Sequence, residues 1–169
     1  MNSVAKYLIH LLCLLIIQIA ILDNIQLHSY FYINIYILAV LILPYGMNKV
    51  SVLLIAFLLG IVIDLANNTM GIHAAATTFL AYLRPRLILL TSNREQIDEI
   101  QTTHKISNFG WFFKYALLST LAFNGVLILA EAFGFSNFMI TLLRICCSTL
   151  ASFFFILLYY FIALKTKKE

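Results

Sequence analysis

The chain has 169 residues, of which 63% are hydrophobic and 11% are charged. An average soluble domain is about 25% charged and about 45–50% apolar, so this composition excludes an ordinary soluble domain and predicts a polytopic membrane protein. The net charge is +4, and most basic residues lie near the ends of apolar runs. They form no continuous stripe, which argues against nucleic-acid binding and is typical of a membrane topology signal.

Six apolar segments follow one another, and we expect them to form six transmembrane helices in one all-α domain, residues 1–169. The expected spans are about 4–22, 25–43, 50–64, 71–83 (with an extension to 90 as an alternative), 111–133 and 138–164. The third segment would cover roughly 22 Å, less than a hydrocarbon core of about 30 Å. Tight packing, local thinning of the bilayer or a re-entrant pair would each accommodate the short third and fourth segments.

Basic residues indicate how these spans are oriented. Six spans place both termini on one side, together with Lys6, Lys49, a loop at about residues 84–110 and the terminal lysines. The opposite connections, near residues 23–29, 65–70 and 134–137, contain no Lys or Arg. The positive-inside rule therefore predicts that both termini and the loop are cytoplasmic.

Asp64 is a carboxylate at the end of the third apolar segment, just before a short polar turn. One interpretation is an interfacial acid that reaches water or caps the start of the next helix. The other is a buried acid that bonds across the hairpin or binds a partner, because a carboxylate is costly in lipid. His73, just beyond the turn, is its candidate neighbour.

Glu131 and Arg144 form a second pair of intramembrane charges, near the facing ends of the last two segments. A short connection brings these segments back antiparallel, so we expect an ion pair that fastens two helices, with a transport site as the alternative. Asn34 and Asn124 lie within spans and are expected to hydrogen-bond between helices.

The fourth segment is rich in small residues: Gly71, Ala74, Ala75, Ala76, Thr78 and Ala81. Such residues allow the backbone of a second helix to approach closely, so this segment is the predicted docking face. At its end, Arg84-Pro85-Arg86 is expected to stop the helix and to set topology. Contact of the two arginines with anionic lipid headgroups is the alternative.

Catalytic and metal-binding patterns do not emerge from the sequence. The Ser, Cys and His residues are scattered, with no nucleophile–base spacing, no phosphate loop and no HExxH motif. The three cysteines lie inside apolar segments without metal-ligand spacing. We therefore expect no enzyme activity and no cofactor.

Residues 58–83 carry a family resemblance. The run Leu58-Leu59-Gly60-Ile61-Val62-Ile63-Asp64, an Asn-containing turn, Gly71-Ile72-His73-Ala74-Ala75-Ala76 and Leu80-Ala81-Tyr82-Leu83 resembles the rod-shape-determining membrane protein family MreD. The turn lacks the proline often found in that family. The resemblance implies a fold similar to the substrate-binding components of energy-coupling-factor transporters, and a place in the bacterial inner membrane.

The resemblance also implies partners. The chain would be a non-enzymatic subunit of the elongation complex, binding MreC and acting with MreB, RodA and a class B penicillin-binding transpeptidase. The alternative is a vitamin-binding component of an energy-coupling-factor transporter, although the first segment lacks the AlaxxxAla pattern that often docks the coupling subunit. A membrane enzyme is a third class, without a candidate site.

Overall fold

The computed structural model describes residues 3–23, 32–93, 97, 108–132 and 138–165. The predicted all-helical class is confirmed, since the elements of this part are helices and none is a strand. In chain order they are α1 (Ser3–Ile17), the π-helical segment η1 (Gln18–Leu22), α2 (Ile37–Leu41), α3 (Lys49–Asn67), α4 (Ile72–Thr91), α6 (Phe109–Glu131), α7 (Phe138–Tyr159) and the π-helical segment η2 (Tyr160–Lys165).

Three of the described helices are long and apolar enough to cross a membrane: α3, α6, and α7 continued to Ala163. The apolar helix Ile9–Leu22 is shorter. At about 1.5 Å per residue, the 19 residues of α3 cover roughly 28 Å, close to the thickness of a hydrocarbon core. The number of six spans stays a prediction.

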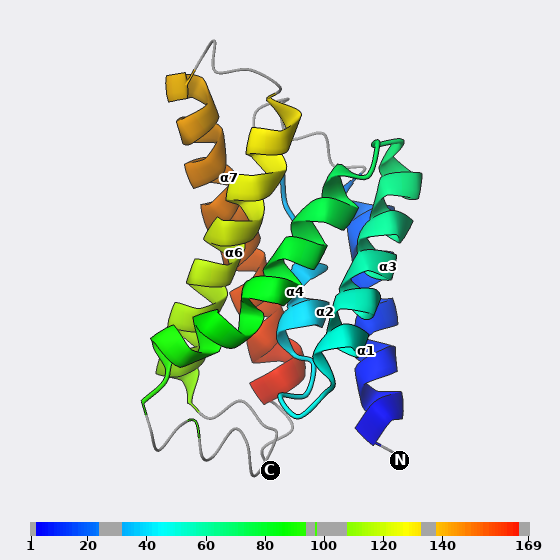
Figure 1. The fold of residues 1–169 in the computed structure, drawn as a ribbon, viewed down its shortest axis with the longest axis vertical. Helices are drawn as coiled ribbons and strands as arrows, with labels where there is room; N and C mark the ends of the chain where they lie inside the picture. Colours follow the sequence, from blue (N-terminus) through cyan, green and yellow to red (C-terminus); the bar gives the residue numbers. More distant parts are fainter. Residues whose placement is uncertain (1–2, 24–31, 94–96, 98–107, 133–137, 166–169) are drawn as a thin grey trace.

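Two antiparallel hairpins flank the short central helix α2 (Figure 1). Helices α3 and α4 form one hairpin, and α6 and α7 form the other. Helix α4 runs diagonally from α3 to the side of α6 (Figure 1). It therefore packs against α3 within its own hairpin and against α6 of the other hairpin. Helix α1 begins and η2 ends at one end of the molecule, and the turn between α3 and α4 lies at the opposite end.

The second apolar segment differs from the expected span over 25–43. Its helix covers only Ile37–Leu41. Residues 32–35 are non-helical, and all of them except Tyr32 are buried. Residues 24–31 lie outside the described part. Non-helical backbone at membrane depth needs hydrogen-bond partners from the protein. The structure provides them from side chains, so a continuous helix is not required here.

Side chains of the first and last helices hold this non-helical segment. Ser148 and Ser152 on α7 accept hydrogen bonds from the backbone amides of Tyr32 and Asn34, at 3.0 and 2.9 Å. Gln18 of η1 accepts from the amide of Ile35 at 2.9 Å and donates to the carbonyl of Ile33 at 2.9 Å. These bonds take the place of the helical ladder.

The third segment is longer than predicted, and the fourth follows its alternative bounds. Helix α3 continues beyond 64 to Asn67, and α4 continues beyond 83, through Pro85, to Thr91, close to the alternative end at 90. The expected stop at Arg84-Pro85-Arg86, and with it the loop boundary at 84, is therefore wrong. Proline removes one backbone donor and crowds the preceding turn, but Leu87 and Ile88 beyond it pack into the core and hold the helix together.

Arg84 is buried instead of facing the membrane surface. Its Nη2 donates to the backbone carbonyl of Leu43, just beyond the end of α2. This bond gives a partner to the Leu43 carbonyl, which follows the end of α2 and accepts no bond from within that helix. The rest of the expected loop, residues 94–96 and 98–107, lies outside the described part.

The interior is apolar with a few polar pairs. Tyr36 is fully buried and meets Phe123 edge-on, with ring centroids 5.8 Å apart. Beside it, Asn34 Nδ2 donates to Asn124 Oδ1 at 3.2 Å, so both residues hydrogen-bond in the interior as expected, although Asn34 does so from non-helical backbone and not from a helix. This bond joins the non-helical segment to α6.

Candidate functional site

The turn between α3 and α4 is organised by Asp64. Its carboxylate accepts hydrogen bonds from the backbone amides of His73 (3.0 Å) and Ala74 (2.8 Å), and from the hydroxyl of Thr69. It therefore satisfies amides at the first turn of α4, where the helix dipole also favours a negative charge. The cap comes from the preceding helix instead of the residue directly before α4, which is Gly71 with φ +83°.

Of the two interpretations of Asp64, the buried acid that bonds across the hairpin is confirmed, while of the interfacial interpretation only the capping role holds and the contact with water is wrong. Only 5% of the residue is exposed. The predicted Asp64–His73 contact exists through the His73 backbone, whereas the His73 ring points elsewhere: its Nδ1 lies 3.0 Å from the hydroxyl of Tyr36. The ring thus links α4 to the segment before α2.

Helices α3 and α4 approach very closely at Gly60. A Cβ atom at this position would overlap the backbone of Ala74 and the hydroxyl of Thr77. Glycine is therefore required here because only its lack of a side chain permits the contact. Together with the Asp64 cap, this contact fixes the spacing and register of the two helices.

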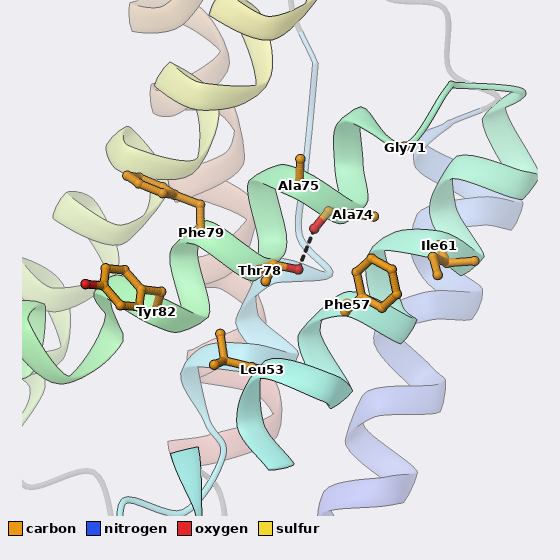
Figure 2. A pocket seen from close by; sticks show the side chains of 9 residues that line it. All are labelled: Leu53, Phe57, Ile61, Gly71, Ala74, Ala75, Thr78, Phe79 and Tyr82. Carbon is orange, nitrogen blue, oxygen red and sulfur yellow. Dashed lines mark hydrogen bonds between the residues drawn. The ribbon is translucent and has the colours of Figure 1, made fainter. Parts of the chain in front are cut away.

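An apolar groove of about 570 Å³ runs along the outer side of this hairpin. Helix α3 contributes one wall and α4, with Gly71 at its start, the other, as Figure 2 shows. The lining residues are Leu53, Phe57, Ile61, Gly71, Ala74, Ala75, Thr78, Phe79 and Tyr82. The hydroxyl of Thr78 donates to the Ala74 carbonyl at 2.7 Å, so its hydrogen-bonding need is met within α4.

Of the small residues predicted as a docking face, Gly71, Ala74, Ala75 and Thr78 line this groove, whereas Ala76 and Ala81 are buried in the core and do not. The α3 wall, with the bulky Phe57, could not be foreseen from the small-residue pattern, which concerns α4 alone. The groove is bounded by side chains that are themselves exposed, including Phe57, Phe79 and Tyr82. It opens outward from the helix pair.

The predicted ion pair between Glu131 and Arg144 is confirmed, with Oε2 and Nη2 3.5 Å apart. Sequence reasoning missed its third member, Tyr32, whose hydroxyl accepts from Arg144 Nη2 at 3.4 Å. The guanidinium carbon also lies 5.6 Å from the centroid of the Tyr32 ring. The cluster joins α6, α7 and the non-helical segment, as expected of a helix-fastening pair.

The structure does not bring the predicted residues into one site. Asp64, Gly71, His73, Ala75 and Thr78 belong to the α3–α4 hairpin and its turn, whereas the ion pair belongs to the α6–α7 hairpin (Figure 1). Across the described ranges, no group of three or more His, Cys, Asp or Glu residues is arranged to hold a metal ion.

The fold and the groove define a class: an all-helical protein with helices able to cross a membrane and an apolar groove along one hairpin. Comparisons with protein-family models, with curated proteins and with solved structures find no match.

Proposed function

We propose that the chain is a non-enzymatic membrane subunit of the bacterial elongation complex, an MreD-type protein that docks MreC and helps to determine rod shape. The observation that carries this proposal is the position of Gly71, Ala75 and Thr78 along one outward-facing apolar groove. The resemblance of residues 58–83 to MreD supports the assignment of the complex. Six spans, cytoplasmic termini and a fold similar to energy-coupling-factor substrate-binding components belong to the same proposal.

The small-residue half of the groove, defined here as Gly71, Ala74, Ala75 and Thr78, is suited to receive a partner's transmembrane helix. In lipid, helices associate through close van der Waals contact, because the surrounding chains are as apolar as the side chains. The spacing of these residues puts them on one face of α4. A facing helix can therefore come near the α4 backbone over two turns.

Pre-organisation explains why the hairpin suits this role. The Asp64 cap and the Gly60 contact set the two walls of the groove before a partner arrives. A surface that is already ordered loses less conformational entropy on binding. In this mechanism the protein acts as a scaffold for MreC, and through it for RodA, the class B transpeptidase and MreB.

The test is recovery of MreC with an Ala75→Phe variant from membranes solubilised in mild detergent. A phenyl ring at this exposed position fills the small-residue half, and we expect recovery to fall by about tenfold, equivalent to about 1.4 kcal/mol. Leu150→Phe is the matched control, because Leu150 is 65% exposed on α7. Equal recovery of MreC with both variants would contradict docking in the groove.

A vitamin-binding component of an energy-coupling-factor transporter is the second candidate. The observation in its favour is the non-helical segment 32–35 in the interior, next to Asn124, whose Nδ2 has no hydrogen-bond partner. Interrupted helices with free polar groups form substrate sites in transporters. Co-purification with an ATPase and a coupling protein, instead of MreC, would select this candidate.

A further inference from the structure

The groove has a second half with different chemistry. Its lining changes from small residues to Leu53, Phe57, Phe79 and Tyr82, which we call the aromatic half. A cation lies over the Tyr82 ring at the end of this half. The guanidinium carbon of Arg86 is 5.4 Å from the centroid of that ring. Both side chains are exposed.

Lys49 supplies a second cation at the same end. It lies four residues before Leu53, which in turn lies four before Phe57, so the three residues follow one face of α3. Because the two helices are antiparallel, Lys49 at the start of α3 and Arg86 near the end of α4 lie toward the same end of the hairpin. The amino terminus of α3, where the helix dipole is positive, is at this end too.

Neither cation has a carboxylate partner in the described part of the chain, where the single ion pair joins Arg144 and Glu131. Two exposed positive charges therefore lie next to the aromatic half: Lys49, one turn before Leu53 on α3, and Arg86, over Tyr82 on α4. An occupant that complements this surface is apolar over about half a hairpin length and anionic at one end.

We propose that the aromatic half binds an anionic phospholipid, with its phosphate between Lys49 and Arg86 and one acyl chain along Leu53, Phe57 and Tyr82. Basic pockets between membrane helices bind such headgroups through charge attraction. Helix α3 covers roughly 28 Å, so the aromatic half corresponds to one leaflet of a core about 30 Å thick. The acyl chain ends near mid-membrane and leaves the small-residue half free.

A phospholipid fits this half better than a second helix does. Bulky side chains such as Phe57 and Phe79 keep another backbone at a distance and weaken helix contact. An acyl chain is flexible and follows an irregular apolar wall. The proposal is independent of MreC, because it uses the opposite half of the groove.

The experiment measures phosphatidylglycerol binding to the purified full chain in detergent by native mass spectrometry. Lys49→Gln and Arg86→Gln should each weaken binding about fivefold, since one cation near an anionic headgroup contributes about 1 kcal/mol. The double variant should lose about 25-fold and bind no better than the wild type binds phosphatidylcholine. Lys114→Gln, an exposed basic residue on α6, is the matched control and should leave binding unchanged.

A separate variant tests the acyl chain. Leu53→Trp enlarges the wall of the aromatic half, so it should weaken phosphatidylglycerol binding although all charges remain. Unchanged binding in Leu53→Trp, or an equal loss in Lys114→Gln and Arg86→Gln, would overturn the site. Arg86→Lys keeps the charge and should retain binding, which separates loss of charge from loss of fold. Failure to recover MreC with the wild-type chain would leave these results untouched.

Discussion

The two hairpins satisfy their intramembrane charges by different means. In the α3–α4 hairpin, the Asp64 carboxylate accepts hydrogen bonds from backbone amides of the next helix, and the two helices are in contact at Gly60. In the α6–α7 hairpin, Glu131 is paired with Arg144, and Tyr32 joins them from another segment. A backbone cap uses no side chain from a neighbouring helix, so the first hairpin keeps its outer face free. The second uses its charges to hold a third segment in place.

Gly60→Ala should have the largest effect on the stability of the first hairpin. The new Cβ atom would overlap the Ala74 backbone, and relieving the overlap should cost about 3 kcal/mol of unfolding free energy. Thermal unfolding in detergent measures the loss. Gly125→Ala on α6 is the matched control, because a Cβ there meets nothing within 4 Å and should be neutral or stabilising by up to about 1 kcal/mol. Equal melting temperatures for the two variants would refute the close approach.

Removal of the cap should have the next largest effect. Asp64→Ala leaves the amides of His73 and Ala74 without their acceptor, which should cost about 2 kcal/mol. Asp64→Asn keeps an oxygen acceptor and should cost less. The comparison variant is Asp23→Ala, which removes, among the described residues, bonds to the side chains of Gln18 and Asn67 and should be better tolerated. A cap role is untenable if Asp64→Ala and Asp23→Ala melt alike.

The second hairpin should show coupling between its charges. Arg144→Ala leaves Glu131 without its ion-pair partner, so it should destabilise more than the combined Arg144→Ala and Glu131→Ala change. The coupling energy should be about 1 kcal/mol, because both side chains are partly exposed. A double-mutant cycle by thermal unfolding in detergent measures it. Full additivity would mean that the pair contributes nothing beyond its individual side chains.

Contacts near in sequence, or between neighbouring antiparallel segments, could be predicted. Asp64 precedes α4 by a short turn, and Glu131 and Arg144 face each other across one connection, so spacing alone places these groups together. Small-residue spacing also gave Gly71, Ala75 and Thr78 of the α4 wall, but not Phe79 and Tyr82 of the same wall. The opposite wall on α3 required the register of the hairpin, which Gly60 sets.

Features that depend on distant packing could not be predicted. The residues from Ile33 to Leu43 form an almost unbroken apolar run, typical of a continuous helix. The break depends on hydroxyl groups of α7 more than a hundred residues away. Likewise, local chemistry places a helix end at Pro85, and only burial of the following turn overrides it.

The segment 32–35 also imposes an order on assembly. The acceptors for the amides of Tyr32 and Asn34 lie 116 and 118 residues later, on the last helix. While the chain is being synthesised, these amides have no native partner until α7 has emerged and entered the membrane. An unpaired amide in hydrocarbon is costly, so the second segment completes its native backbone bonding only when α7 docks. A segment made more than a hundred residues later thus locks an earlier one in place.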